Sequence, residues 1–168
     1  MIIMICSQLP SQGKDLATQF LVENFDGVRV AFADKLKDYA KSLTWDGNKD
    51  TKGRTFLIDL GCICRKYNQN IWVEKTTEKI DDIILRGNSV IVSDFRFLSE
   101  YTYLKQYYKD IIILGIESNI LGNKEFANNE SQIEYNIIKK DYVIENNGTI
   151  EEFKNKILKI MEDINNVK

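Results

Sequence analysis

The chain has 168 residues, of which 43% are hydrophobic and 29% charged, and its formal net charge is −2. This length suffices for one domain with a sizeable core, and the balanced charge gives no general attraction to nucleic-acid polymers or membranes. The apolar N-terminal run Met1–Cys6 is too short for a signal peptide and lacks a basic flank, and no apolar run reaches the length of a bilayer span. We therefore expect one cytoplasmic domain over residues 1–168, with neither a membrane nor a nucleic-acid polymer as partner.

Histidine is absent from the sequence, and cysteine occurs three times. The absence of histidine excludes a Ser-His-Asp triad, a Cys-His pair and any metal site that needs an imidazole. Cys62 and Cys64 have the wrong spacing for a zinc knuckle, and together with Cys6 we expect them to be buried and reduced. Catalysis would have to use carboxylates, lysines, arginines and backbone amides. Phosphoryl transfer is one chemistry that can run on such groups, because it depends mainly on positioning and charge neutralisation.

Short apolar runs rich in β-branched residues alternate along the chain with longer segments of helical periodicity. The predicted strands are Ile2–Cys6, Val28–Phe32, Ser89–Ser93, Ile111–Ile116 and Tyr142–Ile144. The predicted helices are Lys14–Asn24, Lys35–Leu43, Arg54–Tyr67, Ile71–Leu85, Ser99–Tyr108 and Ile150–Ile164. Because the strands are mostly apolar throughout, we predict an α/β three-layer sandwich around a central, mostly parallel five-stranded sheet.

The first predicted strand leads into a loop that ends in Gly13-Lys14, where the first helix begins. This arrangement is typical of a P-loop, in which backbone N–H groups and the helix N-terminus bind phosphates and the lysine reaches the outer ones. The loop departs from the pattern G-x-x-x-x-G-K-[ST] at two positions, since Gln8 replaces the first glycine and Asp15 replaces the magnesium-binding hydroxyl residue. An ordinary helix start after a glycine turn is the alternative interpretation.

Charged residues also follow the second and third predicted strands, and ligands of parallel sheets bind at this end of the strands. Asp34 follows the second strand, and Asp94 and Arg96 follow the third. An aspartate there resembles the acidic partner of a P-loop, which orients Mg²⁺ or its waters, and an arginine can contact one phosphate twice. The alternatives are a carboxylate that caps the next turn and a surface ion pair.

Arginine is scarce, because only five of the 23 basic residues are arginines. Such a bias favours the idea that arginine is kept where a planar, bidentate cation is needed. Arg54 and Arg65 lie on one predicted helix about three turns apart and could share a face, whereas Arg29 and Arg86 read as ordinary surface residues. Trp72 suits either base stacking or core packing, of which core packing is the more common.

Together these segments resemble the deoxynucleoside monophosphate kinase family known from tailed phages. The specific matches are the block Phe32-Ala33-Asp34-Lys35-Leu36-Lys37 and the block Ser93-Asp94-x-Arg96-Phe97-x-x-Glu100. The weaker matches are Gln12-Gly13-Lys14-Asp15, Leu60-Gly61 through Arg65, Ile71-Trp72-Val73 and the region 141–149. They occur in the family's order and cover nearly the whole chain. The resemblance implies a P-loop kinase fold, ATP with Mg²⁺ as donor and a deoxynucleoside 5′-monophosphate (dNMP) as acceptor. It also makes a homodimer possible.

The resemblance also implies roles for individual residues. For catalysis it implicates Lys14, Asp94, Arg96 and Arg65. The donor phosphates would be held by Ser11, Gln12, Gly13, Lys14, Asp15 and Leu16. The acceptor would be lined by Asp34, Lys37, Arg65, Trp72 and Arg96. Mg²⁺ would be held by Asp15 and Asp94.

Related kinases close an arginine-bearing lid after the fourth strand, and we expect a lid-like insertion at about residues 117–131. Between Glu117 and Glu130 the only basic residue is Lys124. The altered P-loop and the arginine-free lid leave an alternative function open. In that alternative, the protein has a kinase fold and binds nucleotide, but with weak or no turnover.

Overall fold

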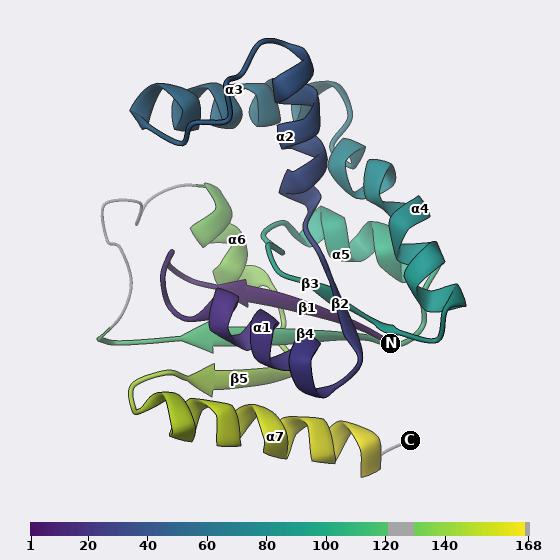
Figure 1. The fold of residues 1–168 in the computed structure, drawn as a ribbon, viewed down its shortest axis with the longest axis vertical. Helices are drawn as coiled ribbons and strands as arrows, with labels where there is room; N and C mark the ends of the chain where they lie inside the picture. The colour runs from purple at the N-terminus through teal and green to yellow at the C-terminus, as the bar shows by residue number, and fades with distance from the viewer. Residues whose placement is uncertain (121–129, 167–168) are drawn as a thin grey trace.

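Five strands form a single sheet in the computed structural model, which describes residues 1–120 and 130–166 (Figure 1). The strands are β1 (Ile2–Ser7), β2 (Gly27–Val30), β3 (Ser89–Val92), β4 (Ile111–Glu117) and β5 (Tyr142–Glu145). They lie in the order β2-β3-β1-β4-β5, and every neighbouring pair is parallel. The predicted α/β architecture around a five-stranded sheet is therefore confirmed.

Helices cover both faces of the sheet. One face carries α1 (Lys14–Asn24) and α7 (Ile150–Asn166), and the other carries α4 (Ile71–Leu85), α5 (Leu98–Lys105) and α6 (Glu130–Ile137). None of the described helices combines the length and the apolar character needed to cross a membrane.

The central strand β1 is apolar throughout because it is buried on both faces of the sheet. Successive side chains of a strand point to opposite faces, so Ile2 and Met4 pack in the core beneath α4 and α5, while Ile3 and Ile5 pack in the core beneath α1 and α7. All four are at most 2% exposed. Burial on both faces therefore accounts for the unbroken apolar run from which the strand was predicted.

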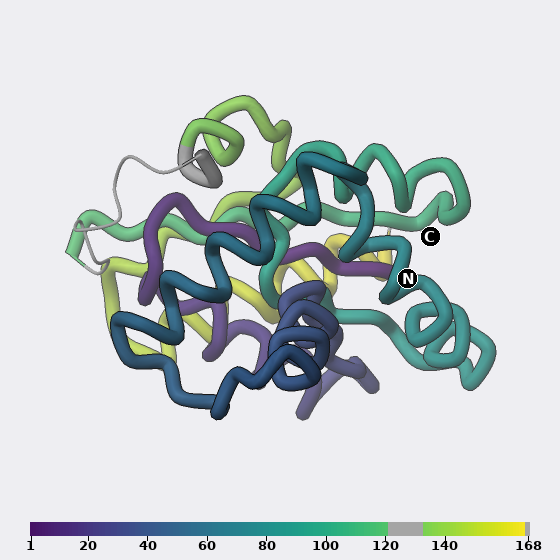
Figure 2. The backbone as a smooth tube through the Cα atoms, turned by 90° about the horizontal axis from the view of Figure 1, so that it is seen from above, coloured from purple at the N-terminus to yellow at the C-terminus, as the bar shows by residue number. Residues whose placement is uncertain are grey.

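The helices α2 (Phe32–Ser42) and α3 (Thr51–Tyr67) stand apart from the sheet at the top of the view in Figure 1. We call this pair the arm. Seen from above, α3 runs across the molecule (Figure 2), and it packs against α2. The side chain of Asp50 begins α3, because its Oδ1 accepts a hydrogen bond from the Gly53 N–H at 2.7 Å.

The start of α2 differs from the prediction. The apolar run predicted a strand up to Phe32 and a helix only from Lys35, but β2 ends at Val30 and α2 already begins at Phe32. The reason is a distant carboxylate. Asp94, after β3, accepts hydrogen bonds from the N–H groups of Phe32 at 3.0 Å and Ala33 at 2.8 Å, which satisfies the first turn of the helix.

The sequence analysis assigned no helix to the α6 region, since Glu130, the first residue of α6, closes the polar stretch assigned to the lid-like insertion. Residues 121–129, which hold most of that insertion including Lys124, lie outside the described part of the chain.

Candidate functional site

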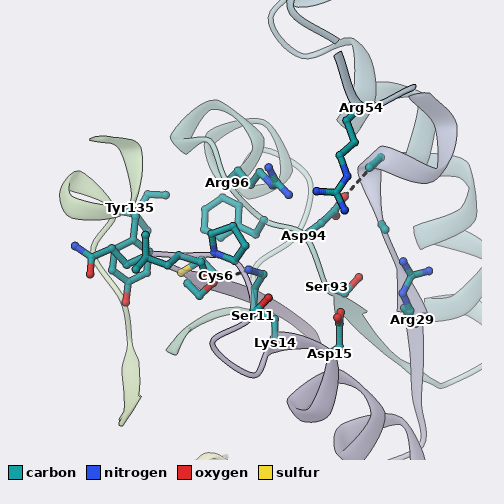
Figure 3. Close-up of a pocket in the computed structure, with 18 of the residues that line it drawn as sticks. Cys6, Ser11, Lys14, Asp15, Arg29, Arg54, Ser93, Asp94, Arg96 and Tyr135 are labelled. Atoms are coloured by element: carbon teal, nitrogen blue, oxygen red, sulfur yellow. Dashed lines mark hydrogen bonds between the residues drawn. The ribbon is translucent and has the colours of Figure 1, made fainter. Parts of the chain in front are cut away.

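A cavity of about 500 Å³ lies where the carboxyl ends of the central strands meet the arm (Figure 3). Its wall comes from the loop after β1, the segments after β2 and β3, the arm and α6. Among the described residues, six basic side chains line it, against two acidic ones: Lys14, Arg29, Lys37, Lys49, Arg54 and Arg96, with Asp15 and Asp94. A cavity with this excess of positive charge, in a chain whose net charge is −2, is suited to an anionic ligand.

The loop between β1 and α1 adopts left-handed backbone conformations at two residues, Ser11 with φ of +66° and Gly13 with φ of +112°. Ser11 therefore takes up a conformation that glycine usually adopts. Gln8 has no positive φ. The backbone of this loop thus needs no glycine at the position where the P-loop pattern has its first one.

Gly13 cannot be replaced without a collision. A Cβ atom at this position would lie 2.5 Å from Nδ2 of Asn146, in addition to the strain of a side chain at this φ.

Lys14 extends along the loop toward the cavity. Its Nζ donates a hydrogen bond to Oγ of Ser7 at 2.5 Å, and the Ser7 hydroxyl donates to the carbonyl of Leu9 at 2.7 Å. Burial lowers the pKa of Lys14, and the nearby positive charge of Arg96 lowers it further. A phosphate oxygen would offer this desolvated ammonium a stronger, charge-assisted acceptor than a hydroxyl.

The other residues predicted to hold donor phosphates divide into two groups. The side chains of Ser11 and Asp15 line the cavity with Lys14. The side chain of Gln12 is buried, and Leu16 packs against the core beneath α1 and α7. Gln12, Gly13 and Leu16 could therefore contact a phosphate only through their backbone N–H groups.

Asp94 lies at the cavity and also caps a helix, although the helix is α2, far from it in sequence, and not the turn that follows it. It lines the cavity beside Arg96, and its two carboxylate oxygens accept the hydrogen bonds that begin α2. Burial raises the pKa of Asp94 despite these hydrogen bonds. The carboxylate thus joins the end of β3 to the arm.

Glu100 is a residue that the sequence analysis quoted only as part of a motif. It is 8% exposed, and its Oε2 accepts hydrogen bonds from the backbone N–H groups of Arg96 at 3.0 Å and Phe97 at 3.1 Å. These bonds hold the turn that presents Arg96 to the cavity. Burial raises the pKa of Glu100 from 4.5 to about 8.

The raised pKa of Glu100 makes a prediction about stability. Between pH 4.5 and about 8 the carboxyl of Glu100 is protonated in the folded protein and ionised in the unfolded chain. The contribution of Glu100 to the free energy of unfolding is therefore highest below pH 4.5, and it falls as pH rises from 4.5 through about 8. Glu100→Gln keeps an oxygen for both N–H groups and removes the charge. In urea unfolding at pH 5 and pH 9, we expect wild type to lose more stability than Glu100→Gln. Parallel pH profiles would contradict the assignment.

Asp34 holds two cations in place at the cavity edge. It pairs with Arg29 at 2.8 Å and with Lys37 at 3.0 Å, and it is these two side chains, not Asp34, that line the cavity. Partial burial raises the pKa of Asp34, but the hydrogen bonds from Arg29 and Lys37 outweigh it and lower the pKa overall. Arg29 is therefore part of the cavity wall rather than the ordinary surface residue that its sequence context suggested.

The two arginines of α3 have different surroundings. Arg54 lines the cavity and its Nε donates to the carbonyl of Lys49 at 2.9 Å, whereas the guanidinium of Arg65 lies 4.6 Å from the ring centre of Phe97. Arg65 and Trp72 are not among the cavity-lining residues. Trp72 is 6% exposed and packs edge-on against Tyr39, which is the core arrangement that the sequence allowed.

The opposite end of the cavity is lined by residues to which the sequence analysis gave no role in a site. Tyr135 and Ile138 come from α6 and the residue after it, and the Tyr135 hydroxyl donates to Glu117 at 2.8 Å. Cys6 also lines this region, and burial raises its pKa to about 12, so its thiol is not a nucleophile at neutral pH. A helical spacing of apolar residues from Ile133 to Ile138 is the signal by which α6 could have been found.

The acidic residues of the cavity fit Mg²⁺ better than a metal that needs a full set of protein ligands. Within residues 1–120 and 130–166 there is no group of three or more His, Cys, Asp or Glu side chains that could hold a metal. Mg²⁺ needs only one or two carboxylates when phosphate oxygens and waters complete its shell. Asp15 and Asp94 are the two described carboxylates on the cavity wall.

Comparisons with known proteins support the fold. No family model matches the sequence, and no curated protein sequence matches it. Among solved structures, the chain is similar to a dephospho-CoA kinase from Campylobacter jejuni, with a TM-score of 0.58 and 15% sequence identity over 97% of this chain and 96% of that one. The likeness extends over both chains nearly end to end, and it shows that this protein has a P-loop kinase-like α/β fold.

Proposed function

We propose that the protein is a nucleotide kinase that transfers the γ-phosphoryl group of ATP to a dNMP. The observation that carries the proposal is the cavity, in which the P-loop lysine and the cations of the arm face one space on a kinase-like fold. The dNMP as acceptor rests on the sequence resemblance of the blocks around Asp34 and Asp94. The Campylobacter jejuni protein is, by its name, a kinase of dephospho-CoA, so dephospho-CoA is tested as an acceptor beside the dNMPs.

In this proposal the donor phosphates lie against the loop after β1. The backbone N–H groups at the start of α1 and the ammonium of Lys14 would bind them, as the position of Lys14 beside Ser7 allows. Bound Mg²⁺ would neutralise phosphate charge, with Asp15 and Asp94 as its protein ligands or the ligands of its waters.

The acceptor phosphate would lie toward the arm. Arg29 and Lys37, held by Asp34, and Arg54 from α3 provide cations there. Arg96 lies beside Asp94 at the end of β3 and would contact the phosphoryl group in transfer (Figure 3). The protein's contribution to the reaction would be to hold the two substrates in line and to balance their negative charge.

The test is ADP formation from ATP and Mg²⁺ with a panel of acceptors, namely the four common dNMPs, modified dNMPs, the ribonucleoside monophosphates and dephospho-CoA. We expect ADP formation above the ATP-only background with at least one dNMP, and the corresponding dNDP as product by mass spectrometry. Transfer only to another acceptor would overturn the dNMP assignment but retain a kinase.

A second measurement distinguishes loss of turnover from loss of binding. ATP-dependent thermal stabilisation without ADP formation would favour the alternative function, a kinase-fold protein that binds nucleotide without turnover. The altered P-loop, with Gln8 and Asp15 in place of the usual residues, is the feature that favours this alternative. If no nucleotide raised the melting temperature, both functions would be wrong.

Arg54 provides a test of the acceptor side. We expect Arg54→Ala to raise KM for the acceptor about tenfold or more, since a charge-assisted hydrogen bond to phosphate contributes roughly 1.5–3 kcal/mol, while KM for ATP changes little. The matched control is Lys52→Ala, which removes an exposed cation of the same helix that does not line the cavity. Steady-state kinetics with each substrate varied in turn give both values. An unchanged acceptor KM would remove Arg54 from the site.

A further inference from the structure

We infer that Asn146, acting with Gln12, is a positioning residue that holds the phosphate-binding loop in shape for ATP. This inference rests on the proposed binding of ATP and deepens it. The sequence analysis included Asn146 only within the region 141–149, one of the weaker matches, whereas in the structure its side chain contacts the loop.

The buried side chain of Gln12 connects two parts of the chain, the start of its own loop and the end of β4. Its side chain is 1% exposed, its Oε1 accepts a hydrogen bond from the Leu9 N–H at 2.7 Å, and its Nε2 donates to the carbonyl of Ser118 at 3.0 Å. One bond closes the loop across three residues, and the other ties it to the end of β4. The Gln12 side chain is therefore buried within the fold and, unlike Ser11 and Lys14, is not among the residues that line the cavity.

Asn146 holds the same loop from the end of β5. It is 7% exposed, and its Nδ2 donates to the backbone carbonyl of Gln12 at 3.0 Å. Its own backbone is fixed in turn, because its N–H donates to the carbonyl of Glu117 at 2.7 Å and its carbonyl accepts from the Ser118 hydroxyl at 2.8 Å. The peptide that Asn146 fixes leads directly into Gly13, the residue next to Lys14.

These contacts explain how the loop keeps its shape without the consensus glycine at position 8. Two buried side-chain amides tie residues 9–12 to the ends of β4 and β5, so the backbone N–H groups near Gly13 are set before a ligand arrives. A preformed loop binds phosphate without first losing conformational freedom. Removal of the Asn146 bond should therefore weaken ATP binding without affecting the acceptor side, where Arg29 and Arg54 lie.

The experiment compares Asn146→Ala with Asn147→Ala. The control removes an amide of the same turn. Asn147 Oδ1 accepts from the Asn119 N–H at 2.8 Å and from the Ser118 hydroxyl at 3.1 Å, and among the bonds found in the described residues Asn147 makes none to residues 8–13. The dissociation constant for ATP is measured by calorimetry, and KM for ATP and for the acceptor by steady-state kinetics. We expect Asn146→Ala to raise the dissociation constant and KM for ATP about tenfold, the value of one typical hydrogen bond, and to leave acceptor KM within about twofold. Asn147→Ala should leave both within about twofold.

The outcomes separate a positioning role from a merely structural one. If Asn146 only stabilised the fold, Asn146→Ala would lower the melting temperature and the active fraction but leave the dissociation constant for ATP unchanged, and the inference would be overturned. If wild type bound ATP without turnover, the calorimetry would still decide the inference while the proposed kinase activity failed. Wild type that bound no ATP would overturn both.

Discussion

Replacing Lys14 by alanine is expected to lower kcat/KM of the proposed kinase by about 10²–10³-fold or more, in line with the loss of one preorganised charge at a site of developing negative charge. Lys14 is the cation that extends from the phosphate-binding loop itself, and its ammonium is already partly desolvated beside Ser7. Arg96 and Arg54 reach the cavity from other elements and cannot take its place at the loop.

The thermal stability of Lys14→Ala, unlike its activity, should not fall. Burial lowers the pKa of Lys14, which means that the fold works against this charge rather than depending on it. We therefore expect Lys14→Ala to melt at the same temperature as wild type or slightly higher, while its calorimetric affinity for ATP falls. The control is Lys159→Ala, an exposed lysine of α7, which should change neither quantity. Full ATP binding by folded Lys14→Ala would refute the assignment of the loop.

The second large effect is expected for Gly13→Ala. The substitution combines an unfavourable backbone conformation, φ of +112°, with a contact of 2.5 Å between the new Cβ and Asn146 Nδ2. The strain alone costs roughly 1–2 kcal/mol. The contact adds a displacement of Asn146 or of the loop, so we expect ATP affinity to fall at least tenfold, as well as a lower free energy of unfolding.

Gly87→Ala separates these two causes. Gly87 also has a positive φ, +82°, but nothing lies within 4 Å of the position that its Cβ would occupy. This variant should lose a similar amount of stability from backbone strain and keep wild-type affinity for ATP. Equal ATP affinities for Gly13→Ala and Gly87→Ala would mean that the contact with Asn146 has no effect on the loop. Chemical unfolding and calorimetry on both variants give the comparison.

Much of the architecture could be predicted from local pattern. Strands buried on both faces, such as Ile2–Ser7, carry unbroken apolar runs, and parallel strands place their following residues at one edge. For this reason Lys14, Asp94 and Arg96, far apart in sequence, could be expected to face one cavity, and all three line it.

What could not be predicted depends on contacts between distant residues. The start of α2 depends on Asp94, 62 residues away from Phe32, and the loop after β1 is held by Asn146, 134 residues away from Gln12. Arg54 and Arg65 lie about three turns apart on one side of α3, yet Arg54 lines the cavity and Arg65 lies over the Phe97 ring. Such differences arise from how the elements pack, and the local sequence contains no sign of them.

Asp94 faces the cavity and also binds the arm, and this double contact relates the charge in the cavity to the arm. Asp94 is part of the cavity wall, and its carboxylate is also the cap on which α2 begins. A cation in the cavity favours the charged carboxylate and so strengthens its hydrogen bonds to Phe32 and Ala33, whereas unneutralised phosphate charge favours the protonated form and weakens them. The charge of ligands bound in the cavity would therefore be coupled thermodynamically to the position of α2, which packs against α3, the helix that carries Arg54.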